Sequence, residues 1–254
     1  MTVDTTGGSG PYKASGGAIA SFTRHTVFQP KMLPVGQKLP VILWGNGACS
    51  GNGQWFSKFL TEIASHGFVV IANGDPNGSL LSGTTAKDIP DAIEWVYQNA
   101  GTGNWTHLDK TRLAAAGQSC GGIQAYSASV DPRIKLTGIF NSGLIIAENQ
   151  KYFDRLHAPV GYFLGGESDI AYLNGERDYK TLPAKIPTVK ANLPVGHMAT
   201  YGDQYGGKFG KAAVAFFKWQ LKGDTAAGEL FLNPATSSLT KDGWAIESKN
   251  WKRP

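Results

Sequence analysis

The chain has 254 residues, of which 41% are hydrophobic and 17% charged, and this composition excludes a disordered protein because it supplies a sizeable core. The 24 basic and 19 acidic residues leave a net charge of +5 that is scattered rather than gathered in a stripe, so no nucleic-acid partner is expected. No apolar run approaches the roughly 18 residues of a membrane span.

The predicted elements begin after a glycine-rich entry, residues 1–19, which is expected to be loose. Short apolar runs then predict strands at 41–44, 68–72, 113–116, 134–140, 160–164 and 188–193. Helical spacing of apolar residues predicts helices at 55–64, 89–97, 123–130 and 212–221.

This alternation of strands and helices predicts parallel βαβ units. Because the strand segments are apolar throughout, helices should cover both faces of the sheet. We therefore expect one α/β domain over residues 1–254, with three layers and a mostly parallel central sheet. Residues 222–254 are expected to pack along one edge as a polar tail anchored by Trp244 and Trp251.

The segment 117–121, Gly-Gln-Ser-Cys-Gly, lies between a predicted strand and a predicted helix. That context is the one a nucleophile elbow requires, with small residues around a serine on a sharp turn. The serine hydroxyl would stand at the carboxyl edge of the sheet, where open α/β sheets bind ligands. Ser119 is therefore the candidate nucleophile.

A serine hydroxyl needs a base, and in this arrangement the chain order is nucleophile, acid, histidine. Only His157 and His197 follow Ser119 in the chain. His157 comes directly before a predicted strand, which leaves little room for an acid between it and the serine. His197 follows the last predicted strand, directly after a glycine that frees the backbone to turn. It is the predicted base.

The acid should follow the strand predicted at 160–164. Asp169 lies one short loop beyond that strand, and Glu167 is the alternative. A carboxylate there would fix the tautomer of the histidine and stabilise its charged form.

An oxyanion hole needs two backbone N–H groups that point at one position. One would come from Cys120, the residue after the nucleophile, and the other from the loop that follows the strand at 41–44. Asn46 is the predicted donor in that loop, with Gly47 as the alternative. Gly47, Gln118 and Asn141 are further candidates for contact with the substrate.

These segments, in this order, resemble the α/β-hydrolase superfamily. Glu-Ser-Asp-Ile-Ala at 167–171, followed later by Gly-His at 196–197, is similar to cutinase-like polyester hydrolases and to the related dienelactone-hydrolase-like branch. The resemblance covers about residues 20–222. It implies Ser119 as nucleophile, Asp169 as acid and His197 as base, with no metal, no cofactor and no large lid.

The chain departs from the family pattern in three ways. Trp44 precedes the loop glycine where a histidine is common, and Gln118 replaces a bulkier residue before the serine. Dienelactone hydrolases proper use cysteine as the nucleophile, whereas here serine holds that position and Cys120 follows it. Substrate preference therefore does not carry over from the family.

Cys49 and Cys120 lie in the two loops expected to form the oxyanion hole. They are expected to form either a disulfide or a pair of buried thiols. The first ten residues lack the basic and apolar regions of a signal peptide. Few lysines and glutamates, with many Ser, Thr, Gly, Asn and Trp, favour a secreted protein, and a cytoplasmic location is the alternative. The protein is expected to be a monomer.

The predicted function is a serine carboxylic ester hydrolase that acts on a small or polymeric ester through an acyl-enzyme. A lactonase or an amide hydrolase would use the same three residues. A binding protein that kept the fold without catalysis is the alternative from another class.

Overall fold

The computed structural model describes residues 2–145 and 147–251 of the chain. Its strands are β1 (Ala14–Ala18), β2 (His25–Pro30), β3 (Leu39–Gly45), β4 (Val69–Asn73), β5 (Leu108–Gln118), β6 (Ile134–Phe140), β7 (Val160–Leu164), β8 (Thr188–Asn192) and β9 (Ala245–Lys249). Its α-helices are α1 (Ser57–Ser65), α2 (Asp88–Asn99), α3 (Cys120–Ala128), α4 (Tyr172–Thr181), α5 (Gly207–Lys222), α6 (Thr225–Leu232) and α7 (Ser238–Lys241).

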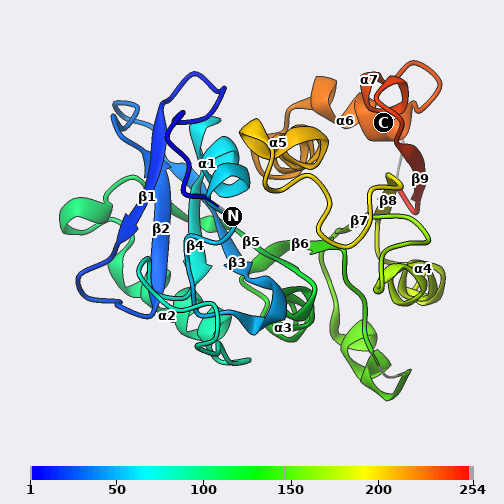
Figure 1. Ribbon diagram of the computed structural model, residues 1–254, viewed down its shortest axis with the longest axis horizontal. Helices are drawn as coiled ribbons and strands as arrows, with labels where there is room; N and C mark the ends of the chain where they lie inside the picture. Colours follow the sequence, from blue (N-terminus) through cyan, green and yellow to red (C-terminus); the bar gives the residue numbers. More distant parts are fainter. Residues whose placement is uncertain (1, 146, 252–254) are drawn as a thin grey trace.

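One nine-stranded sheet runs through the molecule in the order β1-β2-β4-β3-β5-β6-β7-β8-β9. The pairings from β4 through β8 are parallel, and the pairings of β1, β2 and β9 with their neighbours are antiparallel. Figure 1 follows this sheet from β1 at one side to β9 at the other. The predicted α/β class with a mostly parallel sheet is therefore confirmed.

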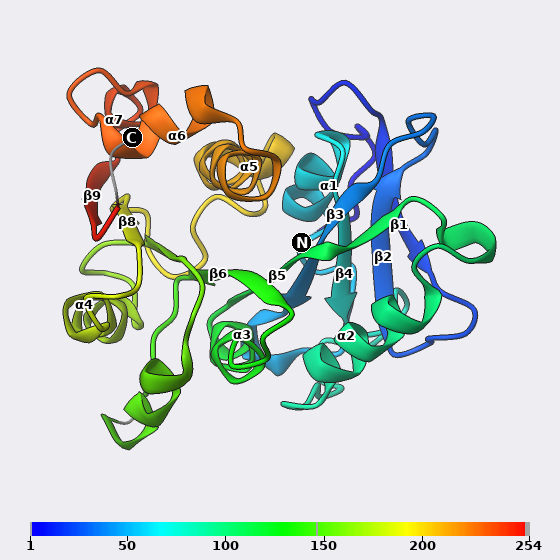
Figure 2. The same ribbon diagram turned by 180° about the vertical axis from the view of Figure 1, so that it is seen from behind.

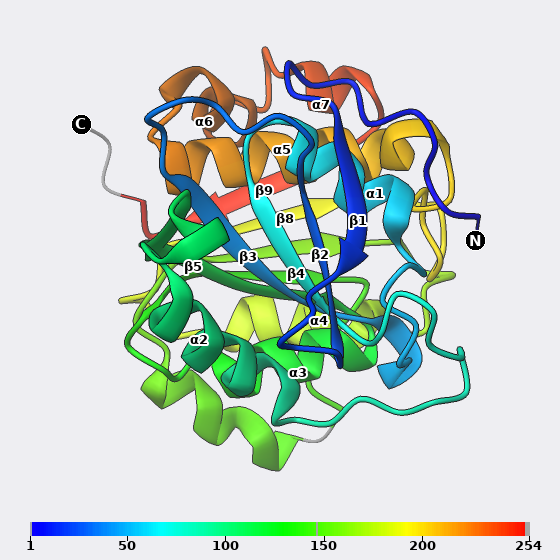
Figure 3. The same cartoon turned by 90° about the vertical axis from the view of Figure 1, so that its left-hand side faces the viewer.

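Helices cover both faces of the sheet, as Figure 3 shows edge-on. The helices α1, α5, α6 and α7 lie on one face, and α2, α3 and α4 lie on the other. Each face has its own buried cluster of side chains. The cluster under α1 and α5 includes Phe59, Phe140 and Phe217, and the cluster under α2 and α3 includes Ile93 and Tyr126. The strands β3, β4 and β7 are buried along their whole length, which is why their sequences are apolar without alternation.

The glycine-rich entry is not loose throughout, because Ala14–Ala18 form the edge strand β1. A glycine is needed there, since a Cβ built on Gly16 would lie 2.4 Å from the Phe28 ring on the paired strand β2. The sequence reads as a flexible entry because two glycines replace the apolar residues that normally mark a strand. That expectation was wrong for Ala14–Ala18.

The segment expected as a polar tail contains α6, α7 and the strand β9. The strand β9 pairs with β8 and closes that edge of the sheet. Trp244, which precedes it, is 1% exposed and packs 4.8 Å from the Phe209 ring of α5. Trp251 is half-buried against Trp219, at 4.4 Å between ring centroids.

The connections after β3 and β5 leave the sheet on opposite sides. Figure 2 shows α3, which follows β5, on the side away from α1, which follows β3. Because β3 and β5 are adjacent and parallel, their carboxyl ends mark the kind of position at which open α/β sheets bind ligands. In the described residues, no helix is both long and apolar enough to span a bilayer.

Candidate active site

Ser119 sits on the turn between β5 and α3 with φ 54° and ψ −121°. This backbone conformation is rare for any residue other than glycine and costs about 1–3 kcal/mol. The turn is held because the Ser119 N–H donates to the Phe140 carbonyl at 3.1 Å and the Ser142 hydroxyl donates to the Ser119 carbonyl at 2.6 Å. This turn places the serine side chain at the carboxyl edge of the sheet.

Three glycines let α3 approach the sheet around this turn. A Cβ built on Gly121 would lie 2.0 Å from the Gly45 carbonyl oxygen, and one built on Gly117 would lie 2.3 Å from the Gly121 oxygen. A Cβ on Gly45 would in turn lie 2.6 Å from that same oxygen. The neighbours are backbone atoms that cannot move aside, so the elbow and the end of β3 are in direct contact.

Ser119, His197 and Asp169 form one chain of hydrogen bonds. The His197 Nδ1 lies 2.6 Å from Asp169 Oδ1, and its Nε2 lies 3.0 Å from Ser119 Oγ. An ionised carboxylate only accepts, so Nδ1 carries the proton and Nε2 accepts from the serine hydroxyl. The structure therefore brings together the three residues that the sequence singled out, with Gly196 before His197 at φ 80°.

Asp169 is 3% exposed and has several donors besides His197. Its Oδ1 accepts from the Ala171 N–H at 2.9 Å, and its Oδ2 accepts from the Gly165 N–H at 3.1 Å and from Asn141 Nδ2 at 2.8 Å. Burial raises the pKa of Asp169, but the hydrogen bonds outweigh it and leave the pKa below its usual value. The carboxylate is thus stabilised in its charged form.

Glu167 and His157 lie outside this hydrogen-bonded chain. Glu167 is exposed two residues before Asp169. The imidazole of His157 lies with Nε2 3.0 Å from the Ile134 carbonyl at the start of β6, the end of the strand opposite to the site.

Two of the three residues expected to touch substrate are scaffold instead. Asn141 is fully buried behind Asp169, and Gln118 is 1% exposed with its Nε2 donating to the His197 carbonyl at 3.0 Å. A Cβ on Gly47 would lie 1.9 Å from Gln118 Oε1, so this glycine makes room for that amide. The substrate-binding prediction is wrong for Asn141 and Gln118 because both side chains turn inward to hold the histidine segment.

The loop after β3 is held by the side chain of Asn46. This residue is fully buried, and its Nδ2 lies within 3.1 Å of the carbonyls of Ser50, Asn52 and Asn73. Its backbone nitrogen would lie 2.7 Å from a Cβ on Gly121, so the loop lies beside the elbow. Cys120 is the first residue of α3, where a backbone N–H has no carbonyl partner within the helix.

Cys49 and Cys120 form a disulfide, so the structure selects this alternative over two free thiols. Their Cα atoms are 5.2 Å apart although 71 residues separate them in the chain. Gln124 of α3 adds to the link, because its Nε2 lies 3.2 Å from the Cys49 sulfur. The loop after β3 is therefore joined to the first turn of α3 by a covalent bond.

A cavity of about 310 Å³ opens beside the Ser119 hydroxyl. It is lined by Ser119, Cys120, Ile123, Ser142, Gly143, Ile145, Ile170, Ala171, Asn174 and His197. Ile145 and Ile170 are 69% and 83% exposed, so the entrance presents apolar side chains to solvent. Val195 and Met198, close to His197 in the sequence, are also exposed.

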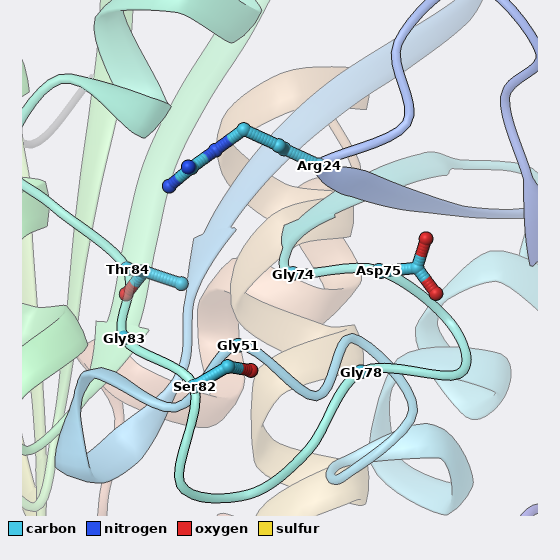
Figure 4. Close-up of a pocket in the computed structure, with 8 residues that line it drawn as sticks. All are labelled: Arg24, Gly51, Gly74, Asp75, Gly78, Ser82, Gly83 and Thr84. Atoms are coloured by element: carbon cyan, nitrogen blue, oxygen red, sulfur yellow. The ribbon is translucent and has the colours of Figure 1, made fainter.

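A second cavity, of about 170 Å³, lies between the loops that follow β3 and β4. Figure 4 shows Arg24 extending over it toward Thr84, while the Asp75 carboxylate points away. The two loops are bonded to each other, since the Thr84 N–H donates to the Cys49 carbonyl at 2.7 Å. None of Ser119, Asp169 and His197 lines this cavity, so it is separate from the hydrogen-bonded chain of those three residues.

In the described part of the chain, His, Cys, Asp and Glu side chains form no group of three or more that could hold a metal ion. Comparison with known proteins assigns no family to this geometry: the chain matches no protein-family model, and a search of curated proteins finds no match.

Proposed function

We propose that the protein is a serine carboxylic ester hydrolase with an α/β-hydrolase fold and a Ser119-His197-Asp169 triad. The observation that carries the proposal is the chain of hydrogen bonds from Asp169 through His197 to Ser119 Oγ, at a strained strand-to-helix turn. A serine with a base in reach, and a base oriented by a buried carboxylate, is the arrangement that activates a hydroxyl nucleophile.

In the acylation step, Ser119 Oγ attacks the ester carbonyl carbon and its proton passes to His197 Nε2. The carbonyl electron pair moves to the oxygen, which becomes an oxyanion. The backbone N–H groups of Cys120 and Asn46 are the expected donors to it. The imidazolium then gives its proton to the leaving alcohol oxygen as the carbon–oxygen bond breaks, and the acyl group remains on Ser119.

In the deacylation step, water attacks the acyl carbon and gives a proton to His197 Nε2. The second oxyanion collapses as the bond to Ser119 Oγ breaks, and the serine recovers its proton from the imidazolium. Asp169 stays ionised throughout and stabilises the positive charge on His197. The lowered pKa of Asp169, which its hydrogen bonds maintain against burial, suits this role.

The cavity beside Ser119 supports an ester with an apolar group next to the scissile bond. Its isoleucines would bury such a group, and its openness to solvent would admit the end of a longer chain. A small ester and an accessible segment of a polymer would both present this chemistry. The disulfide supports a secreted location, because disulfides persist in oxidising compartments.

The test is Ser119→Ala beside Ser168→Ala, a matched change at an exposed serine next to Asp169. With p-nitrophenyl butyrate as substrate, kcat should fall by about 10⁶-fold in Ser119→Ala, the cost measured for a triad serine elsewhere. It should stay near wild type in Ser168→Ala. A fluorophosphonate probe should label the wild type and Ser168→Ala but not Ser119→Ala.

A wild-type protein that takes no label and cleaves no ester would contradict the proposal and favour the binding protein. Label on Ser119 with turnover of a lactone or an amide, but of no open-chain ester, would favour the other hydrolases.

A further inference from the structure

Asn141 occupies a central place behind the proposed triad. It follows β6 directly, and its Nδ2 lies 2.8 Å from Asp169 Oδ2 and 3.1 Å from the Gly196 carbonyl. Its Oδ1 accepts from the Tyr201 hydroxyl at 2.5 Å. One amide thus touches the acid and two points on the segment that carries His197, one residue before the histidine and four residues after it.

The partners of the amide define its orientation. Tyr201 is fully buried, and burial together with the nearby Asp169 charge keeps the pKa of its hydroxyl well above the usual value. The hydroxyl therefore keeps its proton and donates to the carbonyl oxygen of Asn141. The NH₂ group is left to face the Asp169 carboxylate and the Gly196 carbonyl, both of which only accept.

The surrounding backbone is shaped to admit this amide. A Cβ on Gly165 would lie 2.6 Å from Asn141 Nδ2 and 2.2 Å from the Gly196 carbonyl oxygen. Asn141 itself has φ 42°, a conformation in which asparagine is several-fold enriched among residues with a side chain. Tyr201 is fixed in turn by the rings of Phe56 and Phe59, at 5.2 and 5.0 Å.

We infer that Asn141 is a positioning residue of the triad. Its side-chain amide fixes the position of Asp169 relative to the segment that carries His197. This inference rests on the proposed function. The alternative is a purely structural amide that satisfies buried groups without affecting the geometry of the histidine. The two differ in what they predict for turnover and for the proton between His197 and Asp169.

The test compares Asn141→Gly with Asn250→Gly. Glycine accepts the positive φ, so the change removes the amide without backbone strain. Asn250 is a matched control because it has φ 64° and donates through Nδ2 to the Ile186 carbonyl at 3.0 Å, away from the triad. We expect kcat to fall by about 10²-fold in Asn141→Gly, the cost of a misplaced catalytic group, with KM little changed. Asn250→Gly should keep the wild-type kcat.

Two further measurements distinguish a positioning role of Asn141 from a purely structural one. In an Asp169→Asn background, Asn141→Gly should cost little more, because the two residues act through one another. The downfield ¹H NMR signal of the His197 Nδ1 proton, assigned by its loss in His197→Ala, should move or broaden in Asn141→Gly. It should stay in place in Asn250→Gly.

If Asn141→Gly does not fold, Tyr201→Phe carries the test, since it keeps the ring and removes only the donor to Asn141 Oδ1. We expect kcat to fall by up to about tenfold with KM unchanged. A folded Asn141→Gly, or Tyr201→Phe in its place, with wild-type kcat and an unmoved proton signal would overturn the inference. The proton signal can be measured without turnover. If the wild type cleaves no ester, the proposed function is contradicted. A shifted or broadened signal in Asn141→Gly would still support the positioning role.

Discussion

Asp169 and Glu167 lie two residues apart and meet opposite surroundings. Asp169 is buried and accepts hydrogen bonds from Ala171, Gly165 and Asn141 as well as from His197. Glu167 is exposed to solvent. A carboxylate that is fixed by its neighbours can hold an imidazole in one tautomer, and a solvated one cannot.

We therefore predict opposite outcomes for two conservative changes. Asp169→Asn should lower kcat by about 10⁴-fold, because the imidazole is left in the wrong tautomer. Glu167→Gln should change kcat little, since an exposed charge contributes weakly. Both variants are to be assayed with p-nitrophenyl butyrate after circular dichroism shows that they are folded. A large fall of kcat in Glu167→Gln, with near wild-type kcat in Asp169→Asn, would mean that Glu167 rather than Asp169 is the acid.

Some of these residues could be predicted from sequence and others could not. Ser119, Asp169 and His197 each follow an apolar strand at a short distance, so their position at the sheet edge is a local property of the chain. The inward orientation of Asn141 and Gln118 depends on partners far away in sequence, Tyr201 and the backbone of His197. The sequence shows both residue types at strand ends but not which way they turn.

The helix α3 and the strand β3 approach each other closely where Gly121 meets Gly45. Because the atoms that would meet a Cβ on Gly121 belong to the backbone of Gly45, the clash cannot be relieved by a side-chain rotation. Gly17 in the edge strand β1 is the opposite case, with no atom within 4 Å of a built Cβ. The two positions make a matched pair.

We predict that Gly121→Ala lowers the free energy of unfolding by about 3 kcal/mol, the upper range for an overpacked interior. Gly17→Ala should change it by less than about 0.5 kcal/mol, as surface substitutions usually do. Urea denaturation of the two variants measures both values. Equal stability of Gly121→Ala and the wild type would contradict the close packing of the elbow.

The helix α4 carries a buried carboxylate, Asp178, that bonds it to α3 and to the loop after β6. Asp178 is fully buried, and its Oδ2 accepts from the Leu144 N–H at 2.6 Å and from the Tyr126 hydroxyl at 3.1 Å. Burial raises the pKa of Asp178, and the hydrogen bonds from Leu144 and Arg177 offset this only in part. The folded protein therefore holds this proton more tightly than the unfolded chain does.

The sign of the resulting pH dependence follows from that difference. Between the usual aspartate pKa of about 3.9 and the raised value in the folded state, the unfolded chain releases a proton that the folded protein keeps. The stability contributed by Asp178 is thus complete at low pH and is lost as pH rises through the folded pKa.

We predict that the difference in unfolding free energy, wild type minus Asp178→Asn, falls as pH rises from about 4, by at most about 1.4 kcal/mol per pH unit, and then becomes constant. Urea denaturation of both proteins at pH 4 to 7 measures it. A difference that grows with pH would show that Asp178 is stabilised in its charged form.

Helices and strands could not be predicted from the sequence where a regular spacing of apolar residues is absent. The central strands and α1, α2 and α5 bury apolar residues at regular spacing and could be predicted. The helix α4 could not, because its sequence is largely polar. The strand β5 begins at Leu108, five residues before the predicted start, because a bulge and a polar stretch interrupt its apolar pattern.

At the scale of the whole molecule, the disulfide joins two segments that would otherwise meet only through packing. In the unfolded chain it closes a loop with a sequence separation of 71 residues. By the chain-entropy model such a loop contributes about 4 kcal/mol to stability. It also links the two loops that are proposed to hold the oxyanion.

We predict that reduction of the wild type lowers its unfolding free energy by about 4 kcal/mol and lowers kcat for p-nitrophenyl butyrate. The Cys49→Ser/Cys120→Ser double variant should match the reduced wild type and should not respond to reductant. Urea denaturation and ester assays with and without tris(2-carboxyethyl)phosphine measure both effects. A double variant as stable and active as the oxidised wild type would show that packing alone fixes the two loops.

The strand β9 has a consequence for association between chains. It covers β8, whose Val189 and Ala191 are fully buried, and its own side chains include Glu247, paired with Lys190 at 2.7 Å. An edge that carries charges disfavours the addition of a foreign strand, whereas an apolar edge invites it. Removal of β9 would leave the backbone N–H and C=O groups of β8 unpaired at an open edge, able to pair with the same edge of another chain. The strand β9 thus disfavours edge-to-edge association of chains.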